Sequence, residues 1–191
     1  MIEPRKDGQT AIMEPEPGEG EGKSLSWLVA RLAGVIEKEM GAGDVAGLRR
    51  LRPEDPASSA FWKVMASYVR ENWNMPVSGP ALDDAERRWA CLLSALARAK
   101  GLHTHAIEYG KALAEANYSE LRFVRLLRAE DKALFKEIEL AAEYLNSQAQ
   151  PANWAQAAEL LFTRDEEKAE SLRRRISRDY YKALNKKEKK Q

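Results

Sequence analysis

The sequence predicts an all-α protein with about eight to nine helices in two small helical bundles. Apolar residues recur at helical spacing along almost the whole chain, and no segment alternates with period two for long enough to indicate a strand. Candidate capping residues and Gly or Pro breakers separate the apolar stretches. A length of 191 residues allows one domain or two small ones, at roughly 100 to 200 residues per domain.

Four helices are expected in the first half of the chain. Each begins at a Ser or Asp, whose side chain can accept a hydrogen bond from a free N–H group of the first turn, and each is followed by Gly or Pro. They are expected from Ser24 to about Met40, from Asp44 to Leu51, from Ser58 or Ser59 to a point before Pro76, and from Asp83 or Asp84 to about Lys100.

Five further helices are expected in the second half. They run from Thr104 to Glu115, from Ser119 to Arg128, from Asp131 to Leu145, from Asn153 through Leu161, and from Asp165 to about Leu184. We expect an N-terminal bundle of residues 24–115 and a C-terminal bundle of residues 116–185.

The two ends of the chain differ in charge. Residues 1–23 hold six acidic and three basic residues and almost nothing apolar to offset the ordering of the backbone, so they are expected to be a disordered acidic extension. From Arg164 onward there are 11 basic and 6 acidic residues, a net charge of +5. Residues 186–191 are expected to form a basic tail that frays.

The composition excludes several classes of protein. A single cysteine, Cys91, excludes an internal disulfide, and 44% hydrophobic with 32% charged residues is typical of a soluble globular protein. The apolar stretch from Trp89 to Ala97 is far shorter than the ~18 to 20 residues of a membrane helix, and the acidic N-terminus has no signal-peptide core. We therefore expect a cytoplasmic protein without a membrane partner.

Motifs of catalysis are also missing from the sequence. There is no phosphate-binding loop, no dinucleotide fingerprint and no nucleophile elbow. His103 and His105 have no third ligand candidate nearby, and Cys91 has the apolar neighbours of a buried thiol. We expect no enzyme, no metal and no cofactor. We interpret Glu137, Glu139 and Glu143 as part of a solvated helix face. Paired catalytic carboxylates are the alternative.

Arginine is gathered in three places with apolar residues between. Arg49, Arg50 and Arg52 follow a short helix, where cations also favour the helix C-terminus. On the helix at residues 119–128, a step of about 100° per residue places the arginines on one face and the apolar side chains on the other, with Leu121 as the exception. The third cluster is Arg173 to Arg175 with Arg178, which surface ion pairs such as Glu170 with Arg174 explain in part.

A basic stripe on a rigid helix is suited to a nucleic-acid backbone, because arginine meets phosphate oxygens with a planar fork of donors. No helix-turn-helix, zinc finger or RNA-recognition signature is present, so we expect contact that is independent of sequence. Trp62, Trp89 and Trp154 could stack on bases, but their apolar helix faces favour the core, and they are left out of the site. The alternative is a helical protein–protein interaction adaptor whose arginines face acidic partners, and phosphodiester cleavage is a third interpretation.

Several short motifs, in this order and spacing, resemble the CasB family. They are Leu48-Arg49-Arg50 with Pro53, Pro56 and Ala60-Phe61-Trp62, then Gly110-Lys111-Ala112-Leu113-Ala114, Ser119-Glu120-Leu121-Arg122-Phe123 with Leu126-Leu127-Arg128-Ala129, Pro151 with Asn153-Trp154, and Tyr180-Tyr181. The resemblance covers about residues 25 to 182, and it excludes the acidic extension and the lysine tail.

The resemblance implies a non-catalytic small subunit of Cascade, the type I-E CRISPR RNA-guided antiviral DNA surveillance complex of prokaryotes. Its expected partners are the crRNA-coating backbone subunit, the large subunit, a second copy of itself, the displaced non-target single-stranded DNA and, indirectly, the crRNA. Binding of the displaced strand would stabilise the R-loop. The expected nucleic-acid-binding residues are Arg49, Arg50, Arg52, Lys111, Arg122 and Arg128 from these motifs, Arg125 and Lys132 from the helix face, and, on charge and expected exposure alone, Arg87, Arg88 and Lys100.

Overall fold

The computed structural model describes residues 23–56 and 58–189, so almost all of the predicted acidic extension lies outside the described residues. The described part contains no β-strand and only two isolated bridges, which confirms the all-α prediction. Its helices are α1 (Leu25–Lys38), α2 (Ala42–Arg49), α3 (Ser59–Val64), α4 (Arg70–Asn72), α5 (Gly79–Arg98), α6 (Tyr109–Glu115), α7 (Glu120–Arg128), α8 (Asp131–Ser147), α9 (Trp154–Phe162) and α10 (Glu166–Glu188). A π-helical turn at Met65–Val69 joins α3 to α4.

Two of the predicted helix caps are confirmed by hydrogen bonds. The side chain of Ser24 accepts one from the N–H of Trp27 at 3.2 Å, and that of Asp165 accepts one from the N–H of Lys168 at 2.8 Å. Asn153 caps α9 in the same way. Each cap satisfies one of the N–H groups that the first turn leaves without a partner in the helix.

Three predicted helix starts are wrong. Helix α2 begins at Ala42, so Asp44 lies inside its first turn and is not the cap. Helix α5 begins at Gly79, before the predicted Asp83 or Asp84, because Pro80 fits a first turn, where its missing N–H is not needed. Helix α6 begins at Tyr109, after the predicted Thr104. Before it, His103 forms an isolated bridge with Ala152, the N–H of Thr104 donates to the carbonyl of Ala152 at 3.0 Å, and residues 105–107 form a turn.

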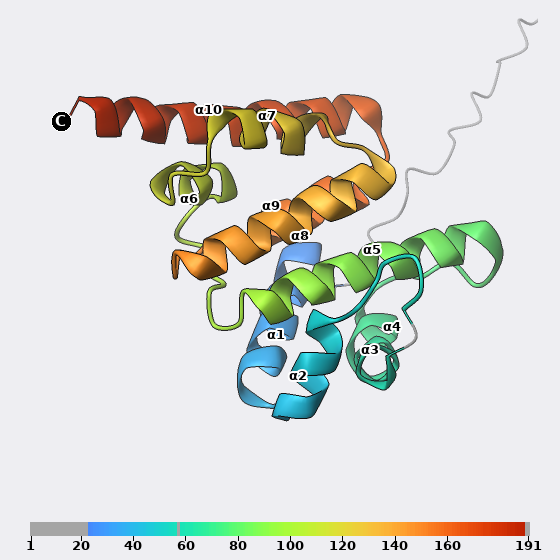
Figure 1. The fold of residues 1–191 in the computed structure, drawn as a ribbon. Coiled ribbons are helices and arrows are strands. Elements are labelled where there is room, and N and C mark those ends of the chain that lie inside the picture. The colour runs from blue at the N-terminus through green and yellow to red at the C-terminus, as the bar shows by residue number, and fades with distance from the viewer. Residues whose placement is uncertain (1–22, 57, 190–191) are drawn as a thin grey trace, which may run out of the picture.

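The helices pack in layers (Figure 1). Helices α6 and α7 lie against α10 along one edge, α8 and α9 cross the middle, and α5 lies below them beside α1 to α4. The division into bundles at residues 115 and 116 stays a prediction. Contacts cross that point, because α6 packs mainly on α10 and α5 packs on α8.

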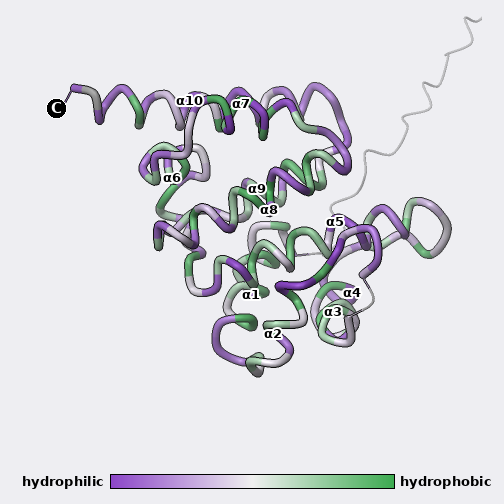
Figure 2. Tube along the Cα trace, in the orientation of Figure 1, coloured by the Kyte–Doolittle hydropathy of each residue, from purple (hydrophilic) through white to green (hydrophobic). Residues whose placement is uncertain are grey.

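One apolar core holds these layers together. Trp89, Trp154 and Tyr109 are fully buried in it, and the rings of Trp89 and Phe162 lie 4.7 Å apart. Figure 2 shows α10 as mostly hydrophilic along its length, so this helix covers the core with a narrow apolar face. None of the described helices is long and apolar enough to span a membrane.

Candidate nucleic-acid interface

Helix α7 has the two faces that the sequence predicts. Phe123 and Leu126 are buried, whereas Leu121, the predicted exception, is 79% exposed. The exposed face holds the arginine stripe, which we define as Arg122, Arg125 and Arg128.

Aromatic contacts fix α7 against α10. The ring of Phe123 stacks on that of Tyr180 with centroids 3.8 Å apart and planes 7° apart. The hydroxyl of Tyr181 donates to Glu120 at 2.7 Å, and that of Tyr180 donates to the carbonyl of Tyr118 at 2.6 Å. The arginine stripe therefore lies on a firmly packed helix, so binding a polyanion requires little ordering of the backbone.

A hollow of about 360 Å³ opens between α7 and α8, beside the arginine stripe. The guanidinium carbon of Arg122 lies 5.7 Å from the ring centroid of Tyr144, which is a cation–π distance. The Tyr144 hydroxyl donates to the carbonyls of Ala116 and Asn117 at 3.1 and 3.0 Å, and these bonds hold the ring in place.

Three exposed cations of α7 and α8, one of which lines this hollow, take part in none of the ion pairs found among the described residues. They are Arg122, Arg128 and Lys132. Their charge is therefore not offset locally, and they are the strongest candidates for phosphate contacts.

Arg125 differs from its neighbours, because its Nε lies 2.7 Å from Oε1 of Glu137. Glu137 is only 6% exposed, so the predicted solvated face is wrong at this position: the carboxylate turns inward and is neutralised by Arg125. Burial also raises the pKa of Glu139 on the same helix, against the opposing effect of Arg98. Arg125 is thus partly structural, although 56% of its side chain stays exposed.

The arginines after α2 have mixed surroundings. Nε of Arg49 donates to the carbonyl of Ala97 at 2.8 Å, so its charge lies at the C-terminal end of α5 and stabilises that helix dipole. Nε of Arg50 donates to the carbonyl of Ala46 at 3.1 Å. Arg50 and Arg52 are both exposed and are available for phosphates.

A chain of contacts connects this cluster to the arginine stripe. Arg49 binds the carbonyl of Ala97. The next residue in the chain, Arg98, pairs with Glu143 of α8. Glu143 lines the same hollow as Arg122. Sequence reasoning missed Arg98, whose partner is 45 residues away in the chain and not on the same helix.

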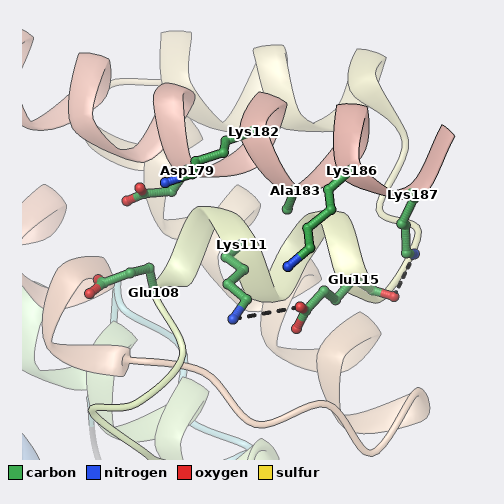
Figure 3. A pocket seen from close by; sticks show the side chains of 8 residues that line it. All are labelled: Glu108, Lys111, Glu115, Asp179, Lys182, Ala183, Lys186 and Lys187. Carbon is green, nitrogen blue, oxygen red and sulfur yellow. Dashed lines mark hydrogen bonds and ion pairs between the residues drawn. The ribbon is translucent and has the colours of Figure 1, made fainter. Parts of the chain in front are cut away.

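Lys111 lies in a second hollow, of about 460 Å³, between α6 and α10 (Figure 3). Its Nζ lies 3.7 Å from Glu115, and Lys186 points toward it from α10. Lys182 lines the same hollow. The sequence showed no reason to join Lys182 and Lys186 to Lys111, because only the packing of α6 on α10 brings them together.

The predicted basic tail is wrong at its start, since Lys186 and Lys187 belong to α10. Nζ of Lys187 donates to the carbonyls of Ala114 and Glu115 and to Oδ1 of Asn117, at 2.8 to 3.0 Å. This ammonium satisfies the free carbonyls at the end of α6. The backbone carbonyl of Asn117 also accepts from Tyr144, so this residue contacts one lining side chain of each hollow.

Of the three candidates chosen on charge and expected exposure, Arg87 and Lys100 are exposed. The expectation is wrong for Arg88, which is 7% exposed. Its guanidinium binds Asp84 at 2.7 Å and the carbonyl of Leu161, and burial lowers its pKa. Arg88 ties α5 to the end of α9 and is withdrawn from the candidate interface.

The sequence also singles out three tryptophans, Cys91 and His103, and most of these side chains are buried or partly buried. Trp89 and Trp154 are buried, whereas Trp62 is 42% exposed. Burial raises the pKa of the Cys91 thiol well above its usual range and lowers that of His103 to about 4. No group of three His, Cys, Asp or Glu side chains that could hold a metal is found within the described residues.

Comparison with known proteins gives a family and a fold. The sequence model of CRISPR-associated protein Cse2 matches residues 44–181. The chain is similar to the crystal structure of CasB from Thermobifida fusca, with 18% sequence identity and a TM-score of 0.58 over 82% of this chain and 95% of that chain. It is also similar to a chain of E. coli Cascade bound to a PAM-containing double-stranded DNA target, with 20% identity and a TM-score of 0.60 over 82% and 96%. No curated protein matches it.

Proposed function

The chain belongs to the CRISPR-associated Cse2 family, and from this we propose that it is a non-catalytic subunit of an RNA-guided DNA surveillance complex of the Cascade type. Its role there is to bind the displaced non-target strand through the arginine stripe, independently of sequence, and so to stabilise the R-loop. The crRNA-coating backbone subunit, the large subunit and a second copy of the chain are the proposed protein partners. The fold shared with a chain of E. coli Cascade supports these partners.

The observation that supports strand binding most strongly is the state of the stripe itself. Arg122 and Arg128 are exposed and take no part in the ion pairs of the described residues, and they lie on a helix fixed by the stacking of Phe123 on Tyr180. Contacts connect the arginine stripe to Arg49 on one side and to Lys187 of α10 on the other. Such an arrangement suits a flexible polyanion better than a compact one.

Small binding energies are sufficient for this role. The guide–target heteroduplex is about as stable as the DNA duplex that it replaces, so R-loop formation is close to balanced. Additional contacts to the displaced strand shift that balance toward the open state. Because this strand differs for every target, contacts to its backbone suit the task better than contacts to particular bases.

Salt dependence of binding tests this proposal. Fluorescence anisotropy of a labelled, unstructured single-stranded DNA, titrated with the full chain, should show affinity that falls about 100-fold between 50 and 200 mM salt if about five phosphates are contacted. The variant with Arg50→Ala, Arg122→Ala and Arg128→Ala should lower the salt slope by roughly 2. An unchanged slope would contradict the site.

A protein-facing surface is the second candidate function, and the exposure of Leu121 favours it. This side chain is 79% exposed on the same face of α7 as the arginines, where an apolar group adds nothing to phosphate binding. Leu121→Gln would then weaken assembly with the other subunits while leaving single-stranded DNA binding unchanged. Loss of assembly together with absence of DNA binding by the wild-type chain would favour the adaptor.

A further inference from the structure

We propose that the hollow between α7 and α8 binds one unpaired base of the DNA strand, face to face with Tyr144. This inference rests on the proposed function, because it assigns a subsite within the same interface. The hollow has a volume of about 360 Å³, and it is lined by the ring of Tyr144, by Leu140 and by Arg122 of the arginine stripe. An aromatic ring beside exposed arginines is the combination that holds single strands without reading their sequence.

The Tyr144 ring is already held in the position that stacking requires. Its hydroxyl donates to the carbonyls of Ala116 and Asn117, and the ring packs in T-shaped geometry on the buried ring of Tyr118, with centroids 5.1 Å apart and planes 69° apart. A ring fixed by these contacts loses little freedom when a base stacks on it, so more of the stacking energy remains as affinity.

Arg122 can close over such a base. Its guanidinium carbon now lies 5.7 Å from the ring centroid of Tyr144. A base held between the ring and the guanidinium needs two van der Waals contacts of about 3.5 Å, or about 7 Å in all, so the guanidinium has to move outward by about 1.3 Å. Arg122 is exposed and forms none of the ion pairs of the described residues, so this movement breaks no bond to a carboxylate there.

Most polar groups around the hollow are already bound to the protein, and the Tyr118 hydroxyl, which has no hydrogen-bond partner among the described residues, is buried away from solvent. Glu143 is bound by Arg98, and the hydroxyl of Ser147 donates to the carbonyl of Tyr144 at 2.7 Å. Arg125 pairs with Glu137. A base is therefore held through its faces, which all four bases share, and this agrees with binding that is independent of sequence.

The test compares two single strands of about 15 nucleotides, one of thymidine and one of abasic residues with the same phosphates. The full chain is used both alone and assembled with the other subunits. Base stacking predicts that thymidine binds at least about 5-fold more tightly than the abasic strand. A strand with 5-iodouracil, which forms a covalent adduct with an aromatic ring stacked on it under ultraviolet light, should modify Tyr144.

Four variants separate base stacking from phosphate contact. Tyr144→Leu should abolish the preference for thymidine, and Arg122→Lys should reduce it while keeping the charge. Tyr144→Phe retains the ring but loses the hydroxyl bonds that hold it, so it should retain part of the preference and shows whether the loss in Tyr144→Leu comes from loss of the ring. Arg128→Ala is the matched charge control: it should weaken binding of both strands by the same factor.

The outcomes distinguish this inference from the function on which it rests. Binding of both strands with equal affinity, without an adduct on Tyr144, would overturn the base subsite and leave strand binding in place. A different outcome is that the arginine stripe adds no affinity for single-stranded DNA, either in the isolated chain or in the assembled complex. That result would overturn both the base subsite and the proposed binding of the displaced strand.

Discussion

The close approach of α6 to α10 gives a sharp prediction for Gly110. A Cβ atom on this residue would lie 2.1 Å from the carbonyl oxygen of Ile176 and 3.1 Å from the backbone nitrogen of Tyr180. Backbone atoms cannot rotate away as a side chain can. To restore an ordinary contact of 3.4 Å, the two helices must separate by about 1.3 Å (3.4 − 2.1). This separation would disturb the stacking of Tyr180 on Phe123, and with it the position of the helix that holds the arginine stripe.

Overpacking of this kind costs up to about 3 kcal/mol, and alanine returns about 1 kcal/mol of helix propensity, so Gly110→Ala should destabilise the protein by about 2 kcal/mol. For a chain of this length the melting temperature should fall by about 4 to 8 °C, measured by circular dichroism. Gly34→Ala is the matched control, because nothing lies within 4 Å of its Cβ position in α1. A Gly110→Ala protein that melts at or above the wild type would refute this account of the α6–α10 contact.

Two further predictions concern buried charge. Arg125→Ala leaves the carboxylate of Glu137 buried without a cation. The free energy of unfolding in urea should fall by about 1 to 2 kcal/mol, a moderate loss because part of Arg125 is exposed. Adding Glu137→Gln should restore most of the lost stability, and a double variant no more stable than the single one would contradict the pairing. Burial lowers the folded-state pKa of His103 from 6.5 to about 4, so the unfolded chain takes up the proton first as the pH drops. The free energy of unfolding should therefore fall between pH 7 and pH 5. The expected loss is roughly 1 kcal/mol, after allowance for the partial exposure of the ring. Thermal melts of wild type and His103→Leu should show that the variant loses less stability over this range, and parallel curves would contradict the assignment.

The sequence predicts well what is decided locally. The two faces of α7 follow from a step of about 100° per residue, and the caps at Ser24 and Asp165 follow from side chains that bond within their own first turn. These features depend on neighbours three or four positions away. They are therefore visible without knowledge of the packing.

What the sequence could not predict depends on distant partners. Arg88 is buried because the carbonyl of Leu161, 73 residues away, accepts from it, and Arg98 joins the interface through Glu143. The isolated bridge of His103 before α6 is formed with Ala152, which is 49 residues away in the chain. The second hollow exists only because α6 packs on α10. No periodicity within one helix reports such contacts, and a charge pattern alone does not distinguish a buried arginine from an exposed one.

The lifetime of the R-loop in the assembled complex tests the central claim most directly. Complexes with guide RNA and target DNA would be built with wild-type chain, with the stripe variant, and with a control variant that removes the same charge elsewhere. The stripe variant contains Arg50→Ala, Arg122→Ala and Arg128→Ala. The control contains Arg70→Ala, Arg174→Ala and Arg178→Ala, at other exposed positions.

Permanganate reactivity of displaced-strand thymines would follow closure of the R-loop after competitor is added. The account predicts that the stripe variant closes at least about tenfold faster than wild type and that the control closes at the wild-type rate. Equal lifetimes for the stripe variant and wild type would contradict the claim that the arginine stripe holds the displaced strand.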